Sequence, residues 1–77
     1  MGMTSSQLDH LDVIAEALRA GDDSGVGVLS TGEKVYVALA ADDADLLKRL
    51  GYTLVAAISR LGPHDILNLV ERWQFRD

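Results

Sequence analysis

The residues with the clearest capacity for acid–base or metal chemistry are two histidines, His10 and His64. A zinc site takes three or four ligands, and the chain has no Cys and no pair of His residues at helical spacing. His10 follows Asp9 on a face that we expect to be solvated. His64 and Asp65 fall in the first turn of a predicted helix, where a carboxylate complements the helix dipole. We therefore predict no catalytic residue, no metal and no cofactor, and we expect that the chain is not an enzyme by itself.

Two short glycine-containing stretches have some features of ligand-binding loops. They are "GDDSG" at residues 21–25 and "STGEK" at residues 30–34. A phosphate-binding P-loop needs the longer frame G-x-x-x-x-G-K-[ST], and an EF-hand needs oxygen ligands across twelve positions. Gly25 and Gly27 lack the third glycine of a dinucleotide fingerprint, and they precede a predicted strand. We interpret both stretches as turns.

The composition is that of one small folded domain. The chain has 77 residues, of which 48% are hydrophobic and 25% are charged. We predict a single domain over residues 1–77, with residues 1–5 as a flexible N-terminal leader. A domain of this size buries only about 60 to 65% of the surface of its unfolded chain, so its core is marginal. Because no Cys is present for disulfides, association with a second chain is the support that remains.

The charge balance bears on the class of partner. The net charge of −5 argues against binding to nucleic acid, which usually requires a basic surface. The acidic residues are concentrated before residue 46, and basic residues outnumber them after it. No basic segment followed by an apolar one opens the chain, and no apolar run reaches the roughly 18 to 20 residues of a membrane span. We expect a cytoplasmic protein with no membrane association.

The first predicted helix runs from about Ser6 to Ala20. Thr4 and Gln7 have the spacing of a capping box, and Gly21 supplies a left-handed stop. One stripe of apolar residues recurs at intervals of three and four, which is typical of an amphipathic helix. This stripe comprises Leu8, Leu11, Ile14, Ala15 and Leu18.

The stretch "GVGVLSTGEKVYVALA" at residues 25–40 predicts a β-hairpin. A two-residue turn at residues 31–32 and a four-residue loop at residues 30–33 both pair Val28 with Val35 and Val26 with Val37. In either register one face of the ribbon is rich in valine. The other face carries Tyr36, and the predicted strands have unpaired edges.

Two further helices are expected in the second half of the chain. The first begins at Asp42 or Asp43 and runs to Leu61, with Gly51 inside it at a cost of about 1 kcal/mol relative to Ala. A continuous or slightly bent helix is favoured, because one apolar stripe passes through Gly51 without a change of phase. This stripe includes Leu46, Leu50, Leu54, Ile58 and Leu61. The alternative is a break into residues 43–50 and 53–61. After Gly62, a last helix is expected over residues 63–73, with Pro63 in its first turn.

The segment over residues 46–76 has the outline of a helix-turn-helix, which motivates an alternative function in nucleic-acid regulation. Asp65 and Glu71 on the second helix would face phosphate, which weakens this interpretation. Trp73 and Phe75 point to different sides if the helix continues, so one of them could anchor a partner while the other lies in the core.

Together these elements predict an α+β fold with the order α-β-β-α-α. We predict a homodimer in which two hairpins join edge to edge into a four-stranded sheet. The leading function is a non-enzymatic, small bacterial interaction or accessory module that binds an unidentified protein partner. A nucleic-acid-associated regulator and an enzyme subunit that is active only in a complex are the alternatives. The predicted partner interface comprises Leu29, Tyr36, Ala38, Trp73 and Phe75.

Overall fold

The computed structural model describes residues 2–75, and within this range the chain is helical and contains no β-strand. Its elements are α1 (Ser5–Arg19), α2 (Thr31–Ala40), α3 (Ala44–Arg49) and α4 (Leu54–Trp73). Helix α4 is kinked at Gly62, where φ is 81° and ψ is 169°. The kink divides α4 into a first segment, residues 54–61, and a second segment, residues 63–73. The predicted α+β fold with its β-hairpin is therefore wrong.

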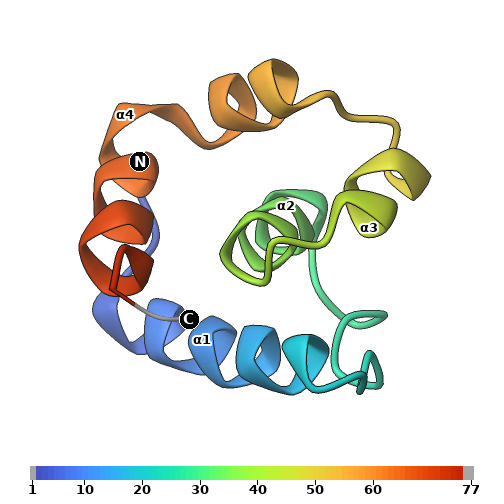
Figure 1. Cartoon of the computed structure of the whole chain (residues 1–77). Helices are drawn as coiled ribbons and strands as arrows, with labels where there is room; N and C mark the ends of the chain where they lie inside the picture. Colours follow the sequence, from blue (N-terminus) through green and yellow to red (C-terminus); the bar gives the residue numbers. More distant parts are fainter. Residues whose placement is uncertain (1, 76–77) are drawn as a thin grey trace.

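Helix α2 is the centre of the molecule. Figure 1 looks along α2 and shows α1, α3 and the two segments of α4 arranged around it. Val35, Tyr36, Val37 and Ala38 have no exposed surface. A helix that is covered on all sides must be apolar on all sides, and the sequence VYVALA meets that requirement.

The local signal that makes residues 31–40 a helix lies at Ser30. The Ser30 hydroxyl accepts a hydrogen bond from the backbone N–H of Glu33 at 3.3 Å, and the Glu33 carboxylate accepts one from the backbone N–H of Ser30 at 2.9 Å. This reciprocal pair is a capping box, which satisfies two N–H groups that a helix start leaves unpaired. The predicted hairpin turn at residues 30–33 is thus the first turn of α2. The alternation of Val35, Tyr36 and Val37 is typical of a strand, but it also fits a helix that is buried all round.

The first predicted strand is a loop. Residues 20–30 connect α1 to α2 through turns, with Val26 buried and Val28 largely exposed. The predicted pairs Val26–Val37 and Val28–Val35 therefore do not form.

The prediction for α1 is confirmed. Thr4 caps the helix, and both hydrogen bonds of the capping box with Gln7 are present. Gly21 has a φ of 96°, the left-handed conformation expected of it. The predicted stripe is the buried face of α1 and packs into the core.

The helix expected between Asp42 and Leu61 is interrupted near Gly51, as in the less favoured alternative with two helices. Helix α3 ends before Gly51, which has a φ of 82°, and Thr53 caps α4 by accepting a hydrogen bond from the N–H of Ala56 at 3.1 Å. The prediction of one continuous helix through Gly51 is wrong. The prediction of a helix that starts at Pro63 after Gly62 and ends at Trp73 is confirmed, since the kink lies at Gly62.

A buried carboxylate ties three helices together. Asp12 Oδ1 accepts hydrogen bonds from the Tyr36 hydroxyl at 2.8 Å and from Trp73 Nε1 at 2.7 Å, while Asp12 Oδ2 accepts one from Arg72 at 3.0 Å. Burial raises the pKa of Tyr36, and the hydrogen bond to Asp12 raises this pKa further. Among the described residues, no buried side-chain nitrogen or oxygen lacks a partner. We refer to Asp12, Tyr36, Arg72 and Trp73 as the Asp12 network.

The described helices were also compared with the requirements of a bilayer. None of those within residues 2–75 combines the length and the apolar character that a transmembrane helix needs.

Candidate functional site

Of the residues singled out for chemistry, His10 lies apart from His64 and Asp65, whose Nδ1 and Oδ1 atoms are 3.3 Å apart. His10 is exposed on α1, and His64 is exposed at the start of the second segment of α4. Asp65 is buried and accepts a hydrogen bond from the backbone N–H of Met3 at 2.8 Å. In the part of the chain that the structure describes, no group of three or more His, Asp or Glu side chains is placed to hold a metal ion.

The five residues of the predicted partner interface do not share a surface. Tyr36 and Ala38 are fully buried in α2, Trp73 is buried in the Asp12 network, and Leu29 is half-buried in the loop before α2. Phe75 is 89% exposed beyond the end of α4. Because residues 2–75 contain no hairpin, the sheet proposed to join two copies has no edge from which to form. Self-association by another surface stays a prediction.

The most unusual surface is the first segment of α4. Ala57 is the one buried residue of this segment. Three large aliphatic side chains are instead open to solvent, with exposed fractions of 63% for Leu54, 78% for Val55 and 48% for Ile58. We call Leu54, Val55 and Ile58 the aliphatic patch. Because they are spaced by one, three and four residues, they occupy one side of the helix.

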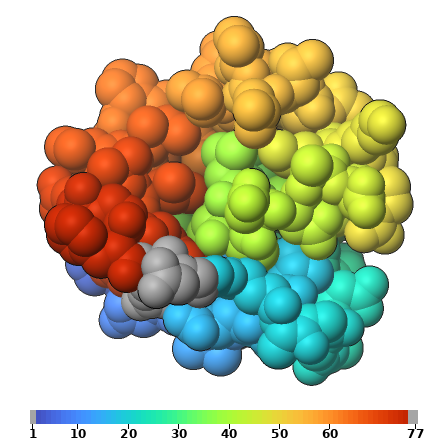
Figure 2. All heavy atoms as spheres, in the orientation of Figure 1, coloured from blue at the N-terminus to red at the C-terminus, as the bar shows by residue number. Residues whose placement is uncertain are grey.

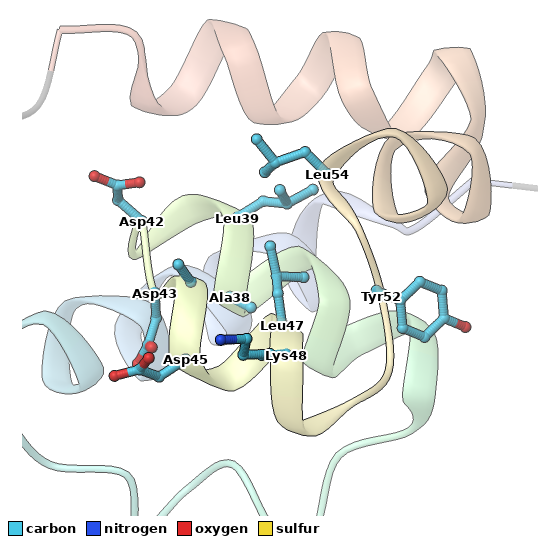
Figure 3. A pocket seen from close by; sticks show the side chains of 10 residues that line it. Ala38, Leu39, Asp42, Asp43, Asp45, Leu47, Lys48, Tyr52 and Leu54 are labelled. Atoms are coloured by element: carbon cyan, nitrogen blue, oxygen red, sulfur yellow. The ribbon is translucent and has the colours of Figure 1, made fainter.

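A groove adjoins this patch, between the carboxyl end of α2, α3 and the start of α4. It encloses about 310 Å³. Figure 3 shows Leu54 directed over Leu39, with Leu47 close by and the ring of Tyr52 at the far end. Leu54 belongs to both the patch and the groove, so the two form one continuous apolar surface.

A second hollow continues from the groove along α4. It encloses about 450 Å³ and shares Leu39 and Asp42 with the first. Val70 and the edge of Trp73 line its other side. Figure 2 shows the face of the molecule on which the surface is hollowed between α4 and the carboxyl end of α2.

The rim of the groove is mainly acidic. Asp42, Asp43 and Asp45 lie at the end opposite Tyr52, and Lys48 is the one cation that lines the same groove (Figure 3). Asp43 accepts a hydrogen bond from the N–H of Leu46 at 3.0 Å and so caps α3. Among the described residues, none of the three aspartates has an ion-pair partner.

The backbone at Asp42 has an uncommon conformation. Helices α1, α2 and α3 all end in a Schellman motif, in which two N–H groups beyond the helix bond back to its last turn. For α2 these bonds run from Asp42 to Leu39 at 3.1 Å and from Asp43 to Ala38 at 2.9 Å. The left-handed position of the motif is Gly21 in α1 and Gly51 in α3, but in α2 it is Asp42, with a φ of 55°. Asp42 is the sole non-glycine residue with positive φ among the described residues.

Sequence reasoning placed Leu54 and Ile58 in a buried stripe and thus missed the patch. In the first segment of α4, however, the stripe is buried only at Ala57 and partly buried at Leu61, which packs against the core. The available signal was Val55, which lies off the stripe and makes the segment apolar over more than one side. A short helix that is apolar beyond one stripe is either buried all round or partnered.

The groove carries carboxylates and one ammonium group around a hydrocarbon floor, and no Ser, Cys or His lines it. In comparisons with protein-family models, with curated proteins and with solved structures, no match to this chain was found.

Proposed function

We propose that this chain is a non-enzymatic protein-interaction module that binds a partner protein through the aliphatic patch and the adjoining groove. The observation that carries the proposal is the first segment of α4, which buries an alanine and leaves Leu54, Val55 and Ile58 in water. A cytoplasmic location belongs to the proposal, since a chain without Cys needs no oxidising compartment.

The energetics of this segment favour a partner. A helix of eight residues is far too short to be stable on its own and depends on tertiary packing. Complete burial of one large aliphatic side chain is worth about 1.5 to 3 kcal/mol. Because the side chains of the aliphatic patch are exposed, most of this stabilisation is absent in the isolated chain. A partner that covers the patch would supply it. Small monomers seldom leave clustered aliphatic side chains uncovered without a binding role.

The nucleic-acid alternative for residues 46–76 is less well supported. Arg72 donates hydrogen bonds to Asp9 at 2.8 Å and to Asp12 at 3.0 Å, so a phosphate would have to compete with two carboxylates. Glu71 is exposed beside it and would repel phosphate. A role as an enzyme subunit that is active only in a complex would use the same docking surface, and identification of the partner would separate it from a purely regulatory role.

The test is a capture experiment with matched surface variants. The chain would be immobilised and exposed to a lysate of its source organism, and bound proteins would be quantified by mass spectrometry. We expect Val55→Gln with Ile58→Gln to lose a partner that the wild-type chain retains. The control is Val13→Gln with Leu67→Gln, the same chemical change at exposed positions on α1 and on the second segment of α4. Equal capture by wild type and both double variants would contradict the proposal, provided that circular dichroism shows the variants folded.

A further inference from the structure

We infer that the groove receives a basic amphipathic helix of the partner, with its apolar face on Leu39, Leu47 and Leu54 and its Lys or Arg side chains toward Asp42 and Asp45. This inference rests on the proposed function and adds the chemistry of the partner. An amphipathic helix laid in an apolar groove is a recurring mode of peptide recognition.

The first argument is charge complementarity. Three carboxylates and one ammonium group line the groove, so its rim is net negative. The negative end of the α2 dipole and the positive end of the α3 dipole meet at this rim, so the carboxylates set its sign. The last turn of α2 contains no basic residue that would offset their charge. An acidic rim around an apolar floor is complementary to a helix with apolar residues flanked by cations.

The second argument comes from the three equivalent helix ends. Left-handed backbone is the natural place for glycine, and the chain uses Gly21 and Gly51 in this role. At the end of α2 it uses Asp42, which carries the backbone penalty of a side chain in that conformation. This penalty opposes folding, and no ion pair of Asp42 within the described residues offsets it. A basic partner would supply that ion pair.

The size of the surface favours a partner helix over the other occupants. The patch consists of three side chains, whereas each side of a standard stable interface has roughly 20 to 30 residues. A second copy docked patch to patch would therefore bury too little. A small ligand enclosed in the groove would leave Val55 and Ile58 uncovered, because they lie outside it. A helix that lies along the groove and overlaps the patch covers both.

The test uses a defined probe. The probe is a fluorescent amphipathic peptide of Leu and Lys about 18 residues long, which makes five helical turns. Its control is the same peptide with Glu in place of every Lys. We expect the Leu/Lys peptide to bind at least about tenfold more tightly at low salt, and to shift the backbone NMR signals of Leu39, Leu47 and Leu54. Equal binding of the two peptides, or shifts confined to other helices, would overturn the inference.

Three variants separate the groove from the overall negative charge. Asp42→Asn with Asp45→Asn removes two charges at the rim, and Asp23→Asn with Glu71→Gln removes two charges at exposed positions that do not line the groove. We expect the first pair to weaken binding by about tenfold and the second by less than about twofold. Asp42→Gly should weaken binding while it raises the urea midpoint of unfolding. Equal weakening by the two pairs would mean that only net charge attracts the peptide, and would overturn the inference.

Failure of this inference differs from failure of the proposed function. If a cellular partner depends on Val55 and Ile58 but the Leu/Lys peptide binds no better than the Leu/Glu peptide, the docking surface stands and its partner is not a basic helix. A mass of two chains in sedimentation, reduced to one by Leu54→Gln, would also overturn the inference in favour of self-association. Tighter binding of the Leu/Lys peptide that depends on Asp42 and Leu54 supports it.

Discussion

The Asp12 network and the groove both place carboxylates next to apolar side chains, but they treat them in opposite ways. Asp12 is buried, and both of its oxygens accept hydrogen bonds from α2 and α4. Asp42 is exposed, in a conformation that suits glycine, and has no partner for its charge among residues 2–75. The hydrogen-bonding groups of the Asp12 network are therefore paired within the chain. The groove instead leaves apolar side chains and carboxylates exposed to a second molecule.

The largest expected effect on stability tests the Asp12 network. Asp12→Ala removes the acceptor that the buried Tyr36 hydroxyl and Trp73 Nε1 share, so both donors lose these hydrogen bonds. We expect the free energy of unfolding to fall by about 3 to 5 kcal/mol, measured by urea denaturation followed by circular dichroism. Asp9→Ala removes an exposed partner of Arg72 and should cost less than about 1 kcal/mol. Similar losses for the two variants would mean that the Asp12 network does not stabilise the packing of α1, α2 and α4.

The next effect tests the kink between the two segments of α4. Gly62 has a φ of 81° and a ψ of 169°, a region that other residues rarely occupy. Gly62→Ala should lower the free energy of unfolding by about 1 to 3 kcal/mol. A Cβ at Gly62 meets no atom within 4 Å, so the loss would come from the backbone and not from a clash. Gly27→Ala, which also has open space and lacks a positive φ, should be close to neutral; a comparable loss there would contradict the backbone explanation.

A smaller effect concerns the cap of α2. The backbone N–H of Ser30 donates to the Glu33 carboxylate, and this bond, together with one from Gln7, lowers the pKa of Glu33 below its ordinary value of 4.5. Because the pKa is lower in the folded chain, this contribution to stability is present above the unfolded pKa and is lost as the pH falls through the folded value. NMR titration of the Glu33 carboxyl carbon should give a lower midpoint in the folded chain than in urea. Gln7→Ala should raise the folded midpoint part of the way, and coincident folded and unfolded midpoints would contradict the cap.

The smallest effect on stability concerns the aliphatic patch. Val55→Gln changes a side chain that is 78% exposed, so the free energy of unfolding should stay within about 0.5 kcal/mol of wild type. Val35→Ala, at a fully buried position of α2, should cost about 2 kcal/mol or more by leaving a cavity. A large loss of stability for Val55→Gln would show that the patch supports the fold of the isolated chain, and would weaken its assignment as a docking surface.

Local chemistry in the sequence was sufficient for several elements. The capping box of Thr4 and Gln7, the stop at Gly21 and the start of a helix at Pro63 after Gly62 depend on hydrogen bonds and backbone preferences within a few residues. Ser30 and Glu33 have the same capping-box spacing, but the sequence-based prediction for residues 30–33 was a hairpin turn.

Only the tertiary structure decided what surrounds each apolar residue. Residues 35–38 are enclosed because α1, α3 and α4 lie around α2 (Figure 1), and the apolar pattern of these four residues alone does not distinguish a buried helix from a buried strand. Leu54 and Ile58 belong to a regular apolar stripe, yet they are exposed while Ala57 in the same stripe is buried. Burial depends on which partners the fold brings near. Hydrogen bonds and backbone preferences within a few residues therefore predicted α1 and the start of the second segment of α4, and the packing determined which helix faces remained exposed.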